Sequence, residues 1–176
     1  MTSRFDSERE YPEGTQALGA APARLTQCAI PRLEHIEKFY VAGLSVPASH
    51  CESETCAARM FDLWCEFFER RIYRRSEHRS TDRRLFGVLR GRDLSGPGVP
   101  SVTVGCSVTS PRQGVCVEAG RYLVFSGSGT MPALTQSLWT SIKHYFNCHP
   151  ELRRRLRSDF EAFSGPTEVA IHVGIV

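Results

Sequence analysis

Residues 101–109 read Ser-Val-Thr-Val-Gly-Cys-Ser-Val-Thr, and apolar side chains alternate there with small polar ones. In an extended chain successive side chains point to opposite faces, so Val102, Val104, Cys106 and Val108 share one face. Such strict alternation is typical of a β-strand that packs one face against a core. The stretch predicts a sheet around which the other elements are arranged.

The sequence on the N-terminal side of this strand predicts a helix and two further strands. Apolar residues recur there at three- and four-residue spacings, as on one buried helix face: Met60, Phe61, Leu63, Trp64, Phe67, Phe68 and Ile72. Residues 36–46 are rich in strand formers and precede Pro47, and residues 85–89 form a short apolar run. The predicted order is strand, helix, strand, strand.

The C-terminal half repeats this order. Residues 115–125, 160–163 and 169–175 have strand character, and a helix is expected to start near Thr130. The apolar stripe of that helix consists of Leu134, Leu138, Ile142, Tyr145 and Phe146. The second half therefore has the same predicted elements in the same order as the first.

Trp64 and Trp139 each follow a leucine at matching places in the two helices, which supports an internal duplication. The duplication predicts an α+β fold of two βαββ halves, residues 31–110 and 111–176, related by a pseudo-twofold axis. We expect one antiparallel sheet with both helices packed on one face and a ligand groove between the halves.

The sheet face away from the helices is predicted to be rich in small residues, namely Thr103, Gly105, Ser107, Ala170 and Gly174. Small side chains leave room for a bound molecule, so this face is a candidate wall of the groove. A plain solvated face is an equally good interpretation, because antiparallel sheets often have one face in water.

The composition is that of a globular protein: 41% of the 176 residues are hydrophobic and 23% are charged. No window approaches the roughly 18 apolar residues needed to span a bilayer, so no membrane association is expected. Residues 1–30 have no sustained apolar period and no apolar segment of a secretory signal. We expect them to form a flexible arm, and the protein to be cytoplasmic.

Seven cysteines are present, and their spacings include no CxxC pair. We interpret them as reduced thiols. The nearest metal-like cluster combines His50, Cys51, Cys56 and Cys65, but Cys65 lies within the apolar helical run and is better explained as a small core residue. Neither a metal nor another cofactor is expected.

Arginine is concentrated in residues 70–84 and 153–157, although the net charge is only +3. Such patches suit contact with phosphates, yet no helix-turn-helix, zinc-finger or RNP aromatic motif accompanies them. A solvated basic surface is the preferred interpretation. Sequence-specific binding of nucleic acid is therefore not expected.

Seven motifs appear in the order found in the gyrase-inhibitor-like (GyrI-like) domain, which this chain resembles over roughly residues 36–176. They are Tyr-Val-Ala-Gly-Leu (40–44), Leu-Trp-Cys-Glu-Phe-Phe (63–68), Leu-Phe-Gly-Val (85–88), Val-Thr-Val-Gly (102–105), Glu-Ala-Gly-Arg-Tyr-Leu-Val-Phe (118–125), Leu-Trp (138–139) and Asp-Phe-Glu-Ala-Phe (159–163). This domain is also the effector-binding part of some AraC-type and MerR-type regulators. The resemblance implies the duplicated βαββ fold with its groove, here as a stand-alone module without a DNA-binding half.

The resemblance further implies a binding site for lipophilic cations, built from a buried glutamate and aromatic rings. The glutamate corresponds to Glu161, and the expected ring neighbours are Trp64, Trp139, Phe86, Tyr122 and Phe163. A carboxylate in apolar surroundings favours a cationic partner, and ring faces attract the same cation. Alternatives remain open: Glu161 paired with an arginine of 153–157, Glu118 as the binding carboxylate, and the aromatic residues as core anchors.

Two departures from the family are phenylalanines, Phe86 and Phe163, at positions where the family often has tyrosine. They imply a more apolar pocket with fewer hydroxyl groups. His172, beside the predicted groove, is interpreted as a solvated strand histidine rather than a catalytic base. No serine or cysteine nucleophile paired with a base is visible in the sequence.

Three functions follow from these observations. The first is a module that binds cationic or aromatic small molecules and acts by sequestration or through a protein partner such as a regulator. The second is a hydrolase of cyclopropane-bearing electrophilic toxins that uses Glu161 as general base. The third is interaction with DNA gyrase through the arginine clusters.

Overall fold

The computed structural model describes residues 30–47, 53–75, 78–91, 100–112 and 114–176, with the backbone alone for residues 53–59 and 75. The predicted N-terminal arm lies outside this description, apart from Ile30. The side chains of His50, Cys51 and Cys56 lie outside it as well. None of the described helices has the length and apolar character needed to cross a membrane.

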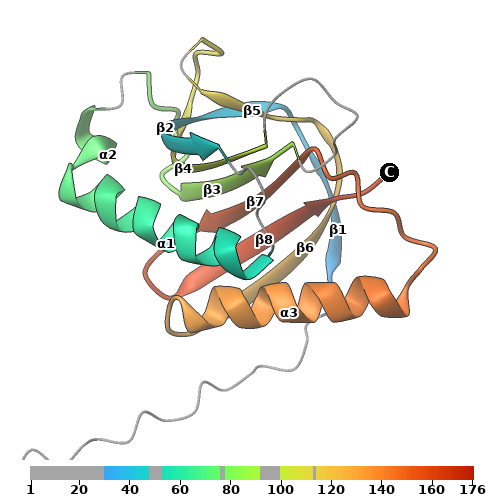
Figure 1. Cartoon of the computed structure of the whole chain (residues 1–176). Coiled ribbons are helices and arrows are strands. Elements are labelled where there is room, and N and C mark those ends of the chain that lie inside the picture. The colour runs from blue at the N-terminus through green and yellow to red at the C-terminus, as the bar shows by residue number, and fades with distance from the viewer. Residues whose placement is uncertain (1–29, 48–52, 76–77, 92–99, 113) are drawn as a thin grey trace, which may run out of the picture.

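The described residues form one eight-stranded antiparallel sheet and three helices (Figure 1). In chain order the elements are β1 (Arg32–Ile36), β2 (Phe39–Pro47), α1 (Ser53–Glu69), α2 (Ile72–Arg75), β3 (Leu85–Arg90), β4 (Ser101–Val108), β5 (Val115–Val117), β6 (Gly120–Ser128), α3 (Ala133–Cys148), β7 (Ser158–Phe163) and β8 (Glu168–Gly174). The strand order is β1-β6-β8-β7-β3-β4-β2-β5. The predicted α+β class is confirmed, and β6-β8-β7 mirrors β2-β4-β3 about the central β7–β3 pair.

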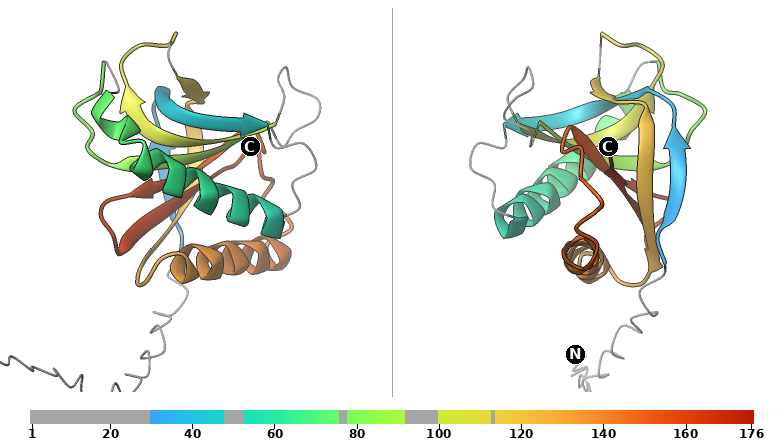
Figure 2. Two further views of the ribbon diagram at one scale, coloured as in Figure 1. Left: turned by 60° about the vertical axis from the view of Figure 1, so that its left-hand side comes forward. Right: turned by 90° about the vertical axis from the view of Figure 1, so that its right-hand side faces the viewer.

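The long helices α1 and α3 lie on the same face of the sheet (Figure 2). From α1, the side chains of Met60, Leu63 and Phe67 pack against the alternating apolar residues of β4. From α3, the buried residue Ile142 packs against the β6 and β8 side of the sheet. The two periodic patterns in the sequence therefore meet as helix stripes on one sheet face.

The apolar stripe of α1 is narrower than the sequence spacing predicts. Phe61 and Phe68 were expected on the buried face, but they are 52% and 50% exposed. Cys65, expected in the core, is exposed as well. On a helix with 3.6 residues per turn only part of a broad apolar stripe can contact a sheet, and these three residues lie on the outer side of it.

The face away from the helices is a second hydrophobic core, which corrects the expectation of an open or solvated surface there. Thr103 and Ser107 are only 2% and 5% exposed. Phe39, Phe86 and Phe160 form a mutually contacting ring cluster on this side. The described small residues Thr103 and Ser107 are therefore buried in this core.

Two strands differ from the sequence-based prediction. β1 was not predicted, because three of its five side chains are exposed at a sheet edge and its apolar content is low. The single strand expected over residues 115–125 is divided into β5 and β6. Gly120, with φ +142°, begins β6 in a backbone conformation that residues with a side chain rarely adopt.

Candidate ligand-binding site

Glu161 lies in the middle of β7, opposite Gly87 of β3 and Ile171 of β8. Its side chain is 4% exposed. The indole Nε1 of Trp139, from α3, donates a hydrogen bond of 2.7 Å to Glu161 Oε1. The sheet therefore holds the carboxylate on the helix face, where a residue of α3 orients it.

No described basic side chain forms an ion pair with Glu161, so its predicted alternative pairing with an arginine of 153–157 is absent from the described contacts. Arg154 pairs with Asp159, and Arg157 approaches Glu118 at 3.8 Å. Burial without a counter-charge raises the pKa of Glu161 to about 7, and the hydrogen bond from Trp139 opposes this shift. Near neutral pH the carboxyl group is thus poised between its two protonation states.

Gly87 provides the space next to this carboxylate. A Cβ atom at Gly87 would lie 2.8 Å from Met60 Sδ and 3.3 Å from Glu161 Oε2. The thioether of Met60, from α1, therefore packs over the strand beside the carboxyl group. Met60 is a flexible, polarisable side chain that can change its packing to admit another molecule.

Aromatic rings continue from this point toward one end of the sheet. Phe163 is two residues beyond Glu161 in β7, on the same sheet face. The ring of Trp64 meets Phe163 edge to face, with centroids 5.3 Å apart, and stacks on Phe68 at 5.8 Å. Trp64, Phe163 and Phe68 thus form an aromatic wall between α1 and the strand ends.

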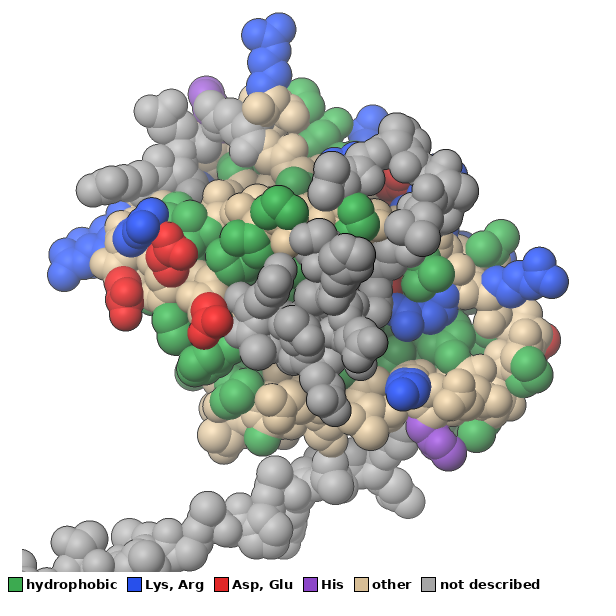
Figure 3. Space-filling model, in the orientation of Figure 1, with side chains coloured by type: hydrophobic (Ala, Val, Ile, Leu, Met, Phe, Trp, Pro, Cys, Tyr) green, Lys and Arg blue, Asp and Glu red, His purple; other side chains and the backbone are tan. Residues whose placement is uncertain are grey.

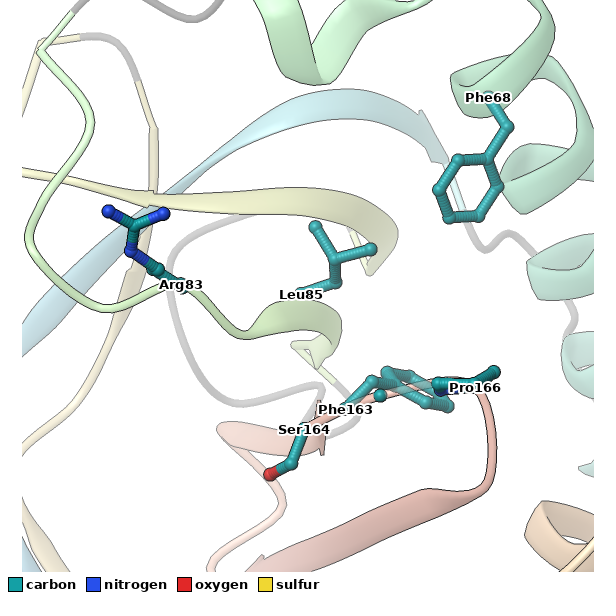
Figure 4. Close-up of a pocket in the computed structure, with 7 residues that line it drawn as sticks. Phe68, Arg83, Leu85, Phe163, Ser164 and Pro166 are labelled. Carbon is teal, nitrogen blue, oxygen red and sulfur yellow. The ribbon is translucent and has the colours of Figure 1, made fainter.

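A hollow of about 330 Å³ lies next to this wall (Figure 4). Its lining consists of Phe68, Arg83, Leu85, Phe163, Ser164, Gly165 and Pro166. Because Phe68 and Phe163 belong both to the hollow and to the aromatic wall, the hollow and Glu161 are separated by a layer of aromatic side chains. The hollow therefore adjoins the aromatic wall, and Phe163 links it to the strand that carries Glu161.

The structure places four of the six predicted site residues together: Glu161, Trp64, Trp139 and Phe163. Phe86 and Tyr122 lie on the opposite face, within the second core. Phe86 is paired with Ala162 and not with Glu161, so its side chain has the opposite orientation.

Tyr122 is fully buried, and its hydroxyl group donates to the Glu118 carbonyl oxygen at 2.6 Å. Tyr122 is therefore a core residue with a hydrogen-bonded hydroxyl group, which is the alternative that the sequence analysis kept open for the aromatic residues. Burial raises the pKa of the Tyr122 hydroxyl, while a hydrogen bond with Ser158 opposes the shift. Glu118 itself has a partly exposed carboxylate close to Arg157.

His172 is also on the face of the second core, and the expectation of a solvated histidine is wrong. The imidazole is 3% exposed and stacks on Phe160, with ring centroids 4.1 Å apart. Burial lowers the pKa of His172 to about 4, so the ring is neutral at physiological pH. Its position in the core excludes direct contact with the Glu161 carboxyl group on the other sheet face.

Met60, Gly87 and Phe68 are parts of the site that the sequence-based prediction did not single out. A signal existed for Gly87, because an isolated glycine in an apolar strand often marks the close approach of another group. Nothing in the pattern distinguishes Met60 from other core residues. Among the residues whose placement is described, no three His, Cys, Asp or Glu side chains gather as metal ligands.

No family model and no curated protein matches the sequence. Solved structures that are similar to this chain include the following three. The integron cassette protein VCH_CASS2 from the mobile metagenome of Vibrio cholerae has a TM-score of 0.63 and 24% identity, over 85% of this chain and 97% of that protein. The structure of SAV2435 bound to tetraphenylphosphonium has a TM-score of 0.67 and 11% identity, over 83% and 93%.

The third structure is a candidate bacterial transcription regulation protein from Staphylococcus aureus MU50, with a TM-score of 0.66 and 12% identity, over 82% of this chain and 97% of that protein. At these identities the likeness establishes a common fold. The chain therefore has the curled antiparallel α+β fold that its resemblance to the gyrase-inhibitor-like domain implied.

Proposed function

We propose that this protein binds lipophilic aromatic cations between α1 and α3, with Glu161 as the counter-charge. The observation that carries the proposal is a buried carboxyl group whose described contacts provide one indole N–H donor and no positive charge. An ionised carboxylate in such a place is costly unless a cation joins it. A ligand that brings both a positive charge and apolar rings satisfies the carboxylate and the surrounding side chains together.

Two further observations support a cationic aromatic ligand, and the surface charge over α1 is mixed. The Trp139 ring adjoins the carboxyl group, and the rings of Trp64 and Phe163 belong to the aromatic wall next to it. Ring faces attract cations. Acidic and basic side chains lie next to each other over α1 on the face seen in Figure 3, and Glu66 of α1 is paired with Arg70 at 2.9 Å. A protein of the same fold, SAV2435, has been solved with tetraphenylphosphonium bound.

We infer that binding serves to sequester such molecules or to signal their presence to a protein partner. The chain spans nearly the whole length of the similar solved structures, one of which is a candidate transcription regulator. We propose that any effect on transcription is exerted through a protein partner.

Calorimetric titration with tetraphenylphosphonium at pH 8 tests the proposal. We expect Glu161→Gln to retain the fold, because the replacement is nearly isosteric, and to weaken binding by about 2 to 5 kcal/mol. The neutral analogue triphenylphosphine oxide should be affected much less, since it does not need a counter-charge.

Glu118→Gln is the matched control, because this carboxylate is partly exposed and lies near Arg157. It should leave the affinity for tetraphenylphosphonium unchanged. If Glu118→Gln weakens binding and Glu161→Gln does not, the wrong carboxylate has been assigned. Absence of any binding by the wild-type protein would refute the proposal itself.

A hydrolase of cyclopropane-bearing electrophiles is a second candidate, favoured by the pKa of about 7 at Glu161. A carboxyl group with this pKa is well matched to taking a proton from water at neutral pH. Product formation from such a compound, with a loss of about 10² to 10⁴ in turnover for Glu161→Gln, would establish it. Unchanged substrate after long incubation would exclude that compound as a substrate.

A further inference from the structure

We propose that the natural ligand carries a hydrogen-bond-accepting oxygen in addition to its positive charge, and that the indole N–H of Trp64 binds this oxygen. The inference rests on the proposed function and narrows the ligand class. Glu161 would select for charge, whereas Trp64 would select for a carbonyl or ether group on an aromatic scaffold.

The observation behind this inference is an unsatisfied donor. Nε1 of Trp64 is buried and has no hydrogen-bond partner within the described part of the chain. The corresponding tryptophan of the second helix, Trp139, uses its Nε1 to bind Glu161. A buried indole N–H without a partner is uncommon in proteins, because tryptophans that are buried usually find an acceptor.

The other buried donors without hydrogen bonds in the described residues have a different explanation. They are nitrogens of Arg154 and Arg155. The guanidinium groups of these residues lie over aromatic rings, at 5.7 Å from the centroid of Phe146 and 4.9 Å from that of Tyr122. Cation–π contact accounts for these nitrogens, whereas Trp64 is neutral and has no such compensation.

The position of Trp64 suits contact with a ligand. Its ring lies against both Phe68 and Phe163, which also line the hollow of about 330 Å³. Glu161 and Phe163 are two positions apart on one strand, which corresponds to roughly 7 Å. A ligand that bridges the carboxylate and the aromatic wall therefore passes within reach of both tryptophans.

The aromatic contacts of Trp64 provide at most a weak substitute for this bond. Its ring is edge to face with Phe67 and with Phe163. An N–H group directed at a ring face gains less than one bonded to an oxygen, so a ligand oxygen would still be preferred. The expected ligand is thus an aromatic cation with an acceptor oxygen several ångströms from the charge.

Benzyltriphenylphosphonium and its ortho, meta and para methoxycarbonyl derivatives provide a matched set of probes. All four ions carry the same charge on a similar scaffold, and three of them add an ester oxygen at different distances. We expect the wild-type protein to bind at least one ester about five- to tenfold more tightly than the parent ion, as expected for one hydrogen bond. In Trp64→Phe the ratio of ester affinity to parent-ion affinity should fall to about one, although the smaller ring weakens the binding of both ions.

Trp139→Phe is the matched control variant. Loss of the Trp139 N–H removes the hydrogen bond to the Glu161 carboxylate. It should weaken binding of the parent ion and of the esters alike, so the ratio of their affinities should persist. A second readout uses the wild-type protein and does not require the variants to bind. The chain has two tryptophans, so the NMR spectrum of the nitrogen-15-labelled protein has two indole N–H signals. The Trp64 signal should shift downfield with the ester and not with the parent ion.

The outcomes separate this inference from the proposed function. If the parent ion binds in a manner dependent on Glu161 but all esters bind equally, the inference about Trp64 is wrong and the proposed function stands. A ratio that survives in Trp64→Phe, or an unmoved Trp64 signal, also overturns it. If neither the parent ion nor any ester binds, both the inference and the proposed function fail.

Discussion

Glu161 and His172 are buried ionisable side chains on opposite faces of one sheet, and burial disfavours the charged form of each. For Glu161 this raises the pKa from 4.5 to about 7. For His172 it lowers the pKa from 6.5 to about 4. The two residues therefore contribute to stability with opposite dependence on pH.

The sign of each contribution follows from proton binding. Between pH 4.5 and 7 the folded protein retains the Glu161 proton that the unfolded chain has lost, so stability falls as pH rises, by about 3 kcal/mol. Between pH 6.5 and 4 the unfolded chain protonates the histidine while the folded protein does not, so stability falls as pH decreases, by about 3 kcal/mol. Over the shared range the two effects cancel.

Two variants separate these effects in urea unfolding experiments from pH 4 to 8. Compared with the wild type, Glu161→Gln should gain stability progressively as the pH rises from 4.5 to 7. His172→Gln should gain stability relative to the wild type toward pH 4. Parallel pH profiles for the wild type and Glu161→Gln would show that the carboxyl group is not held protonated by the fold.

At the residue scale, the sequence indicated which residues to consider for a site but not which sheet face each of them occupies. The motif of residues 159–163 indicated Glu161, and the repeated Leu-Trp pair indicated Trp64 and Trp139. Phe86 and Glu161 lie on opposite faces of the sheet because of the register between β3 and β7. This register joins residues that are far apart in sequence. The hydrogen bond from Trp139 depends on side-chain rotations that no periodic pattern specifies, and so does the Trp64 N–H that has no partner among the described residues.

At the element scale, β2 and β4 approach each other very closely where Gly43 pairs with Gly105. A Cβ atom at Gly105 would lie 2.0 Å from the Ala42 carbonyl oxygen, which belongs to the backbone. Real Cβ atoms do not occupy such positions, so the two strands would have to separate. The glycine pair therefore fixes the shape of this part of the sheet.

Gly105→Ala should destabilise the protein by about 1 to 3 kcal/mol, the usual result of adding a methyl group where no space exists. Gly165→Ala is the control, because no atom lies within 4 Å of the added methyl position. It should leave stability unchanged or raise it by about 0.5 kcal/mol through a stiffer unfolded chain. Equal thermal midpoints for the two variants would contradict the close strand approach.

The elements themselves were largely predictable from periodicity. Alternation over residues 101–109 corresponds to β4, and the apolar stripes correspond to α1 and α3. The division of residues 115–125 was missed, because the break at Glu118-Ala119 spans only two residues and strand-forming residues continue on both sides of it. The exposed ring of Phe68 was missed because spacing alone does not show how wide a sheet contact is.

At the scale of the whole molecule, the candidate site lies where the two similar sets of elements meet. The central pair β7–β3 brings Glu161 opposite Gly87, while α1 contributes Met60 and Trp64 and α3 contributes Trp139. The fold class was predictable from the repeated element order. The expectation of an open or solvated face away from the helices was wrong, because the second core is assembled from long-range contacts that the sequence does not display.

Proton release on cation binding tests the central role of Glu161 most directly. With a pKa of about 7, the free protein holds about 0.9 proton on this group at pH 6 and about 0.5 at pH 7. Titration of tetraphenylphosphonium in buffers of different ionisation enthalpy should therefore show release of about 0.9 and 0.5 proton per bound cation, and none at pH 9. Glu161→Gln should release none at any pH. Binding without proton release at pH 6, or the same release in Glu161→Gln, would contradict the assignment of this carboxyl group as the cation's partner.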